Sequence, residues 1–277
     1  MTEGKVLHAL NTLAENKINI SSLIIDDNWQ DIDYRGDSQW QHGWNDFEAE
    51  PTTFPRGLKA LITDIRSQHK NIQHIAMWHA LIGYWAGIAP NGPLAKRYKT
   101  IQGTRDDSQE MTLVAPESIQ AFYTDFYTFL ASCHVTGVKT DAQYMLDAVV
   151  SPTTRRAVSP AYLDAWITSS LRHFHGHVIS CMSMTPPIVF HTLLPRTRPA
   201  FPFRNSDDFF PHAGPDAQTW HVWSNAHNAL LSQHLNVVPD WDMFQTVDQG
   251  GWLCGLPCRR AVREWWARVH HGRAGQA

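Results

Sequence analysis

The sequence has few of the features that mark specialised classes of protein. Its four cysteines, in 277 residues, form no disulfide-type framework, and Cys254 and Cys258 have no second pair with which to complete a zinc site. No stretch approaches the roughly 18 apolar residues of a membrane span, and the N-terminus carries no apolar signal region. We therefore expect a cytoplasmic protein with free thiols.

Charge of either sign is also sparse. Charged residues make up 18% of the chain and the formal net charge is −3, so nothing attracts it to nucleic acid or to a charged membrane surface. No glycine-rich phosphate loop follows any apolar run, and no repeat is present. What is left is an ordinary globular composition, 43% hydrophobic, whose partner is expected to be a neutral small molecule.

Tryptophan and histidine, by contrast, are frequent, with 12 and 16 copies. Indole faces beside polar groups suit sugars, although most tryptophans belong to the core. A metal-dependent hydrolase is a rival interpretation, built on His173, His175 and His177 or on His221 and His227. No carboxylate or cysteine joins these histidines at ligand spacing, which favours surface histidines and no metal site.

Apolar runs alternate with helical periods along most of the chain. The strands are expected at residues 22–27, 72–81, 137–143, 178–182, 196–208 and 237–242, and the helices at 2–17, 57–69, 116–133, 160–173 and 219–233. Two long segments, 31–55 and 90–116, have no period and are predicted to be loops. Alternation predicts a parallel α/β architecture, and charged groups at so many strand ends favour a (β/α)8 TIM-type barrel over an open doubly wound sheet.

One apolar run ends in Gly-Val-Lys-Thr-Asp-Ala-Gln, residues 137–143. A buried strand here would deliver Lys139 and Asp141 to its C-terminal rim, where barrel enzymes keep their chemistry. An aspartate that closes a strand is more often a turn or helix cap, but similar endings recur along the chain. Asp141 is therefore the candidate nucleophile.

A second acidic pair, Asp207 and Asp208, follows Arg204. Two carboxylates are the minimum for glycoside chemistry, because one attacks the anomeric carbon and the other protonates the departing oxygen. A lysine beside the nucleophile helps it to stay ionised, and an apolar wall such as Phe209 and Phe210 would help the acid to keep its proton.

Five motifs in a fixed order carry a family resemblance. They are Leu-Ile-Ile-Asp-Asp-x-Trp-Gln at 23–30, Met-Trp-His-Ala-Leu-x-Gly-Tyr-Trp at 77–85, Gly-Val-Lys-x-Asp-x-Gln at 137–143, Arg-Asn-Ser-Asp-Asp-Phe-Phe-Pro at 204–211 and Pro-Asp-Trp-Asp-Met-Phe-Gln at 239–245. The chain thereby resembles the raffinose synthase, alkaline α-galactosidase and seed imbibition protein family, within glycoside hydrolase family 36. The resemblance implies a (β/α)8 barrel, a retaining mechanism through a covalent galactosyl-enzyme, and no cofactor.

The resemblance also implies a role for each matched residue. Asp141 is the expected nucleophile and Asp208 the acid/base, with Asp207 as the alternative. The expected substrate contacts are Lys139 as a positioning partner of the nucleophile, Asp26 and Asp27 as acceptors for galactose hydroxyls, Trp29 and Trp78 as pocket walls, Cys181 near the sugar, and Arg204. The expected partner is a raffinose-type oligosaccharide or a galactinol-like donor.

The chain departs from the family at both ends. The six strands correspond to barrel strands two to seven, so strands one and eight are expected to be missing and residues 1–247 to form a partial barrel. Residues 248–277 lack the family's Ser-Gly-Gly-Pro-x-Tyr-x-Thr-Asp pattern, but permitted codons for this tail spell that pattern one nucleotide later. We interpret the tail as a frame-shifted translation.

The function expected from the sequence is therefore transfer of galactose, with retention, to water or to a sugar acceptor. A glycosidase and a galactosyltransferase use the same carboxylates, so the insertions at 31–55 and 90–116 must decide between them. The alternative is a non-catalytic fragment, since an open barrel exposes unpaired strand edges. Such a fragment would at most bind galactosides.

Overall fold

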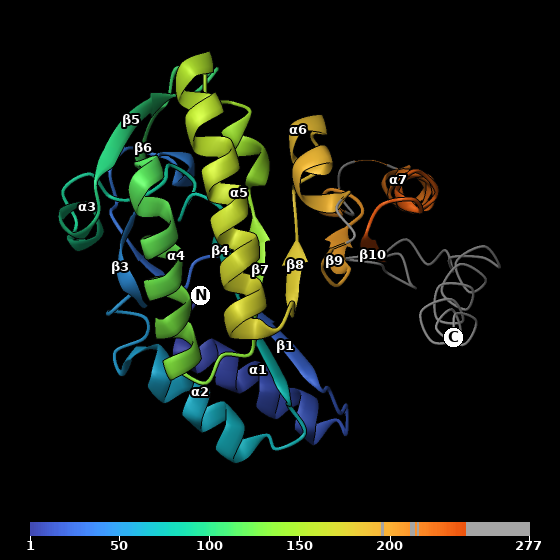
Figure 1. Cartoon of the computed structure of the whole chain (residues 1–277). Helices are drawn as coiled ribbons and strands as arrows, with labels where there is room; N and C mark the ends of the chain where they lie inside the picture. The colour runs from blue at the N-terminus through green and yellow to red at the C-terminus, as the bar shows by residue number, and fades with distance from the viewer. Residues whose placement is uncertain (195–196, 211–213, 215, 242–277) are drawn as a thin grey trace. The chain divides into compact units, whose positions relative to one another are not determined.

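The structure is a computed structural model that describes residues 1–194, 197–210, 214 and 216–241. The chain forms two units, Met1–Thr192 and Leu193–Ala277, and each contains parallel strands joined through helices (Figure 1). The expected boundary of the partial barrel at residue 247 and the tail at 248–277 lie outside the described residues.

Four parallel strands form the main sheet of the first unit, in the order β1, β4, β7, β8. They are β1 (Ser22–Ile25), β4 (His74–Ala80), β7 (Gly137–Asp141) and β8 (Val178–Ser180). Each lies inside a range predicted from its apolar run, so these predictions are confirmed. Because the strands are parallel, their C-terminal ends lie at one edge of the sheet: Ala80 of β4, for example, pairs with Asp141 of β7.

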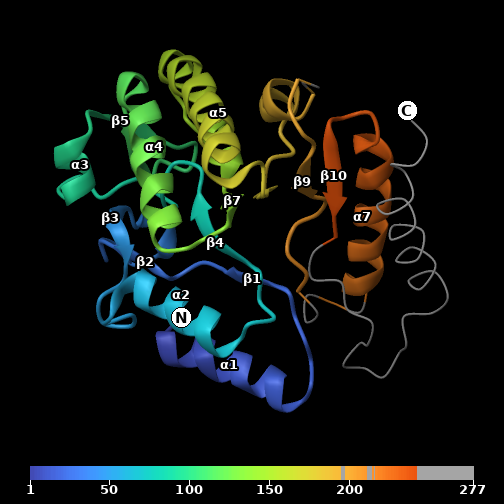
Figure 2. The same cartoon turned by 60° about the horizontal axis from the view of Figure 1, so that its bottom comes forward.

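Four helices of eight or more residues belong to the first unit. They are α1 (Glu3–Glu15), α2 (Gly57–Gln68), α4 (Pro116–Ser132) and α5 (Pro152–Phe174), with shorter segments η2 (Gln143–Leu146), α6 (Pro186–Ile188) and η3 (Val189–Leu193). Helices α1 and α2 lie side by side, and α4 packs against α5 (Figure 2). In α2 the predicted stripe of Leu58, Leu61, Ile62 and Ile65 is completely buried. No helix among the described residues combines the length and hydropathy that a membrane span requires.

Helix α5 begins earlier than expected. The sequence predicted a helix from residue 160 to 173, since proline favours a helix start. Instead the helix starts at Pro152, after Ser151, whose side chain accepts the backbone N–H of Thr154, and Pro160 lies inside it. Ser151 as the N-cap and Pro152 as the first helical residue are both favoured at a helix start. Pro160 lies inside the helix, which packs against α4.

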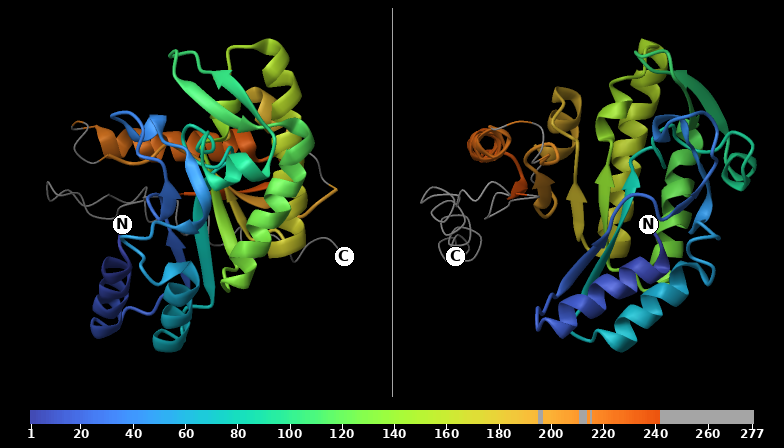
Figure 3. Two further views of the ribbon diagram at one scale, coloured as in Figure 1. Left: turned by 90° about the vertical axis from the view of Figure 1, so that its left-hand side faces the viewer. Right: turned by 180° about the vertical axis from the view of Figure 1, so that it is seen from behind.

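The two long insertions were predicted to be loops, and this prediction was wrong. Each insertion forms a small antiparallel sheet. In the first, β2 (Gln30–Ile32) pairs with β3 (Trp44–Ala49), with η1 (Gln39–Gln41) between them. In the second, α3 (Pro93–Arg97) precedes a hairpin of β5 (Thr100–Thr104) and β6 (Glu110–Val114). This hairpin lies beyond the C-terminal ends of β4 and β7, near the start of α5 (Figures 1 and 3).

A buried polar network ties the sheet to α4 and α5. The Nε2 atom of His79, on β4, lies 3.0 Å from the hydroxyl of Tyr127 and 2.9 Å from Oγ1 of Thr140 on β7. The indole of Trp166, on α5, donates to the same Thr140 oxygen at 2.8 Å. Burial lowers the pKa of His79 from 6.5 to about 4, although the Ala80 carbonyl and Asp141 favour its protonated form. The histidine is therefore neutral near pH 7.

The second unit repeats the same pattern on a smaller scale. Strands β9 (Phe201–Arg204) and β10 (Val237–Asp240) are parallel, and α7 (Ala217–Ser232) connects them. Two side-chain amides tie α7 to the end of β9: Asn205 donates to the carbonyl of Asn225, and Asn228 donates to the carbonyl of Asn205. The bounds of α7 and β10 agree with the predicted ranges to within two residues, whereas β9 is a short strand inside the longer range predicted at 196–208.

The buried histidine predicts a specific pH dependence of stability. Because the pKa of His79 is lower in the folded chain than in the unfolded one, the unfolded chain binds an extra proton between about pH 6.5 and pH 4. The stability present above pH 6.5 is lost as the pH falls through this window, by up to about 3 kcal/mol. Urea unfolding followed by tryptophan fluorescence should show this loss in the parent and a smaller loss in His79→Gln.

Exposed His8 gives the matched control, and His8→Gln should follow the parent curve. Equal pH dependence in the parent and in His79→Gln would contradict the prediction.

Candidate functional site

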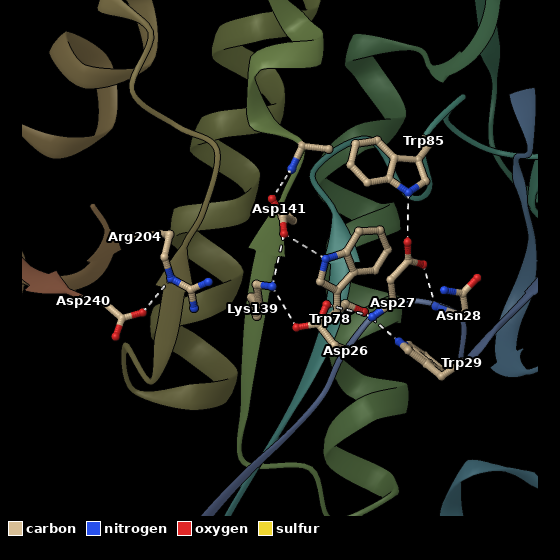
Figure 4. A network of polar contacts seen from close by, with 11 residues as sticks. Asp26, Asp27, Asn28, Trp29, Trp78, Trp85, Lys139, Asp141, Arg204 and Asp240 are labelled. Carbon is tan, nitrogen blue, oxygen red and sulfur yellow. Dashed lines mark hydrogen bonds and ion pairs between the residues drawn. The ribbon is translucent and has the colours of Figure 1, made fainter. Parts of the chain in front are cut away.

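Strand β7 brings two charged groups to its C-terminal end. All five of its residues are buried, including Lys139 and Asp141, which are only 5% and 6% exposed. Side chains two apart in a strand point to the same face, so the ammonium and the carboxylate face the same side (Figure 4). Thr140 between them points to the opposite face, toward Trp166.

The carboxylate of Asp141 is held on both oxygens. Its Oδ1 accepts the backbone N–H of Ala142 at 2.8 Å, and its Oδ2 accepts the indole N–H of Trp78 at 3.0 Å. The ammonium of Lys139 lies 3.4 Å from the same Oδ2. Ala142 adopts a left-handed conformation, with φ of 52°, which costs a residue other than glycine about 1–2 kcal/mol. The chain turns sharply here and presents a fixed carboxylate.

Lys139 joins two carboxylates. Besides Asp141 it contacts Oδ2 of Asp26, at the end of β1, at 2.7 Å. Burial by itself would lower the pKa of this ammonium, but the neighbouring charges of Asp141 and Asp26 outweigh it and leave the pKa raised. The lysine therefore carries its positive charge at neutral pH and links β1 to β7.

Asp27 has a different environment from Asp26. Burial raises its pKa, against the lowering effect of hydrogen bonds that include the indole N–H of Trp85, which donates to its Oδ2 at 3.0 Å. Its other oxygen accepts the backbone N–H of Asn28. Asp26 and Asp27 therefore form two adjacent carboxylates, one paired with a cation and one paired with neutral donors (Figure 4).

The two predicted pocket tryptophans are placed differently from each other. Trp78 contacts Asp141 directly through its indole N–H. Trp29 is completely buried, and its indole N–H donates to the backbone carbonyl of Trp78 at 2.7 Å. Trp29 supports Trp78 from within the core, and its role as a wall of the sugar pocket stays a prediction.

Cys181 follows β8 and is buried, with its backbone N–H bonded to the carbonyl of Thr140. It is a free thiol, as is Cys133. Its sulfur is close enough to influence the pKa of Lys139. The structure therefore brings Asp26, Asp27, Trp78, Lys139, Asp141 and Cys181 together within the first unit, and their roles toward a ligand stay predictions.

The remaining predicted residues belong to the second unit. Arg204, at the end of β9, is 4% exposed, and its Nε donates to Oδ2 of Asp240, at the end of β10, at 2.9 Å. Asp207 and Asp208 are both exposed. Phe209 beside them is buried and Phe210 is exposed, so burial does not choose between the two acids.

Two side-chain pairs, one in each unit, were not predicted from the sequence. In the first unit Trp85 donates to Asp27, and in the second Arg204 donates to Asp240. The register of β9 and β10, in which Arg204 pairs with Asp240, is the signal that could have found the second pair. Asp242 lies outside the described residues.

The histidines provide no metal centre among the residues that the structure describes, where no group of three or more His, Cys, Asp or Glu side chains could hold an ion. What the first unit offers instead is a buried carboxylate with fixed orientation, a shared cation, two further carboxylates and an indole wall. This arrangement can hold a polyhydroxylated ligand and present a nucleophile to it.

The raised pKa of Asp27 predicts that its ionised carboxylate lowers the stability of the folded chain at neutral pH. A raised pKa means that the ionised carboxylate is less favourable in the folded chain than in the unfolded one. Asp27→Asn removes the charge but keeps only one of the two acceptors, so the test is the pH dependence. Relative to the parent, the melting temperature of the variant should increase as the pH rises from about 4 to 7.

The sequence predicts that galactose binds here and raises the parent's melting temperature, and the same variant should then lose most of that upward shift. Asp37→Asn, at an exposed aspartate of the first insertion, is the control and should change neither quantity. No increase in the variant's melting temperature relative to the parent over this pH range would contradict the prediction.

Comparison with known proteins gives a family match over most of the chain. The model of a family described as "Raffinose synthase or seed imbibition protein Sip1" matches residues 45–251. A protein of Arabidopsis thaliana, "Probable galactinol–sucrose galactosyltransferase 1", is 31% identical over 209 residues, which are 69% of this chain and 27% of that protein. Another from the same plant, "Probable galactinol–sucrose galactosyltransferase 6", is 26% identical over 277 residues, 89% of this chain and 36% of that protein. The chain thus spans about a third of the length of these relatives.

Among solved structures, an α-galactosidase from Thermus thermophilus in complex with stachyose aligns with a TM-score of 0.56. The sequence identity is 14%, and the alignment covers 97% of this chain and 56% of that one. This likeness shows the fold alone, which is a (β/α) barrel that is incomplete over the described residues, as the sequence predicted.

Proposed function

The chain belongs to the family of raffinose synthases and seed imbibition proteins, and from this premise we propose that it transfers α-galactosyl groups by double displacement. The observation that carries the proposal is the carboxylate of Asp141, buried at a strand end and fixed by Ala142, Trp78 and Lys139. A carboxylate that is already oriented loses little entropy when it attacks.

In the first step Asp141 attacks the anomeric carbon of a galactoside. The new bond joins a carboxylate oxygen to this carbon, and the bond to the leaving oxygen breaks with its electron pair. Asp208 gives that oxygen a proton, with Asp207 as the alternative acid. The positive charge of Lys139 stabilises the negative charge of Asp141 until the bond forms.

In the second step the galactosyl ester is released to an acceptor. The acid, now a carboxylate, takes a proton from water or from a sugar hydroxyl, and the freed oxygen attacks the anomeric carbon. The bond between this carbon and the Asp141 oxygen breaks, and its electron pair returns to Asp141 as the carboxylate. Water gives galactose, whereas a sugar gives a longer oligosaccharide. The names of the two plant relatives contain galactinol and sucrose, which supports galactinol as the donor and sucrose as an acceptor.

Recognition of galactose is assigned to the carboxylates beside the nucleophile. Asp26 and Asp27 accept hydrogen bonds from sugar hydroxyls, and Trp78 lies along the sugar. Cys181, next to Lys139, limits the space beneath the ring, and Arg204, held by Asp240, donates to the substrate. Asp26 is half exposed in the first unit, so a ligand can reach it while it remains paired with Lys139.

Removal of the nucleophile is the direct test. Asp141→Ala should lower the hydrolysis of an aryl α-galactoside by at least about a thousandfold, because no group remains to form the covalent intermediate. Asp164→Ala, at an exposed aspartate on α5, is the control and should keep the parent rate. Release of phenol by Asp141→Ala at the parent rate would refute the assignment. A parent chain that binds galactose without turnover would support the non-catalytic alternative.

The choice between the two acids has a separate signature. An acid/base variant loses little in the first step when the leaving group is an activated phenol, which needs no proton, but loses much more when it is a sugar. Asp208→Ala should therefore slow release of galactose from raffinose by about a hundredfold or more relative to the aryl galactoside, and Asp207→Ala should not. The reverse pattern would assign the acid to Asp207.

A further inference from the structure

Three indoles form a path from the nucleophile to the surface. Trp78 donates to Asp141, the rings of Trp78 and Trp85 lie 5.9 Å apart between centroids, and those of Trp85 and Trp40 lie 4.3 Å apart. Their exposed fractions rise along the path, from 1% to 7% to 37%. The first two indoles are explained by their bonds to Asp141 and Asp27, but the exposed Trp40 is not explained by the steps proposed above.

The segment that carries Trp40 is held in place although it is exposed. Within it, η1 has a capping box between Ser38 and Gln41, and the guanidinium of Arg35 donates to the carbonyl of Gln41 at 2.7 Å. Directly after η1, the carbonyl of His42 accepts the backbone N–H of Ala86 at 2.9 Å. The indole is therefore displayed at a fixed position, which is what a binding platform requires.

The second insertion meets the first at this tryptophan. Arg105, at the tip of the β5–β6 hairpin, donates to the carbonyl of Trp40 at 3.4 Å, and the side chains of Gln41 and Gln109 are hydrogen-bonded. Arg105 is only 8% exposed, and its Nε, buried, has no hydrogen-bond partner among the described residues. A buried donor without a partner is costly unless a ligand or water satisfies it.

The same hairpin is fastened to the segment that follows the nucleophile. The backbone N–H of Asp106 donates to Ala148, and that of Val150 donates to Thr104. Tyr144, three residues after Asp141, is close enough to Arg105 and to Asp141 for each charge to act on its phenol. Trp40, Arg105 and Tyr144 thus belong to one rim, built from three segments and attached to the site of Asp141.

We propose that Trp40 is the aromatic platform of a carbohydrate subsite that holds the sugar ring attached to the galactosyl group. A pyranose presents a C–H face that packs on an indole, while its hydroxyls can hydrogen-bond to the phenol of Tyr144, which lies near the charged Arg105. This inference rests on the proposed function, since it requires the galactosyl group to occupy the site of Asp141.

The alternative is that Trp40 only covers Trp85. A cover would contribute equally to every ligand of the site, or to stability alone, whereas a platform beyond the galactosyl group contributes only to ligands that extend past it. The two roles therefore differ in the ratio of two affinities.

Calorimetric titration of the 277-residue chain measures that ratio. Asp141→Ala serves as the background, because it prevents turnover, and the two ligands are methyl α-galactoside and raffinose. Adding Trp40→Ala should weaken raffinose binding by about tenfold and change methyl α-galactoside binding by less than about twofold. Trp40→Phe, which keeps an aromatic face, should retain most of the affinity for raffinose. A cooperative thermal melt of each variant shows that it is folded.

Trp220→Ala, at a tryptophan of α7 that is 61% exposed, is the matched control and should leave both affinities unchanged. Equal weakening of both ligands by Trp40→Ala, or no weakening of either, would overturn the subsite. If the background binds neither sugar, the proposed function fails, and the subsite fails with it. Binding of both sugars with a ratio insensitive to Trp40 refutes the subsite alone.

Discussion

The site of the first unit depends on one shared cation. Lys139 is buried, and an isolated buried lysine tends to lose its proton, yet two carboxylates from different strands keep it charged. The ammonium in turn fixes Asp141 from one side and Asp26 from the other. Since Asp26 ends β1 and Asp141 ends β7, this contact also sets how the ends of two strands that are not neighbours approach each other.

The rigidity of this arrangement comes from the opposite face of the same strand. Thr140 points away from the site and joins His79 and Trp166 in the buried network behind it. Because side chains alternate along β7, Lys139 and Asp141 lie on one face of the strand. The hydroxyl of Thr140, with its hydrogen-bond partners, lies on the other. A disturbance of the network behind the sheet would reach Asp141 through a single peptide unit, so core and site cannot be varied independently here.

The sequence could predict the strands and the site of the first unit because both are local patterns. Apolar runs located β1, β4 and β7, and the charged ends of two of them, β1 and β7, pointed to Asp26, Lys139 and Asp141. The insertions could not be predicted in the same way. Strand β5 has only one buried residue in five, Gly103, so its hydrophobic period is weak, and the antiparallel pairing that forms it is decided by tertiary contacts.

Pairings across long separations were also beyond local patterns. Trp85 and Asp27 are 58 residues apart, and Arg204 and Asp240 are 36 apart, so each contact follows from strand order and register, which single residues do not encode. The two exposed acids, Asp207 and Asp208, show the converse limit. They are adjacent in sequence and similar in exposure, so burial does not separate their roles, and the preference for Asp208 rests on the family resemblance alone.

The attachment of the rim has a consequence for how such a protein can change over evolutionary time. The insertions are fastened to the segments after β4 and β7 largely by backbone bonds, such as those of Asp106, Val150 and Ala86. Backbone bonds persist when side chains are replaced, so residues displayed on the rim can be exchanged one at a time while the frame keeps its place. New acceptor preferences would then be reachable through single substitutions, with the buried lysine and its carboxylates inherited unchanged.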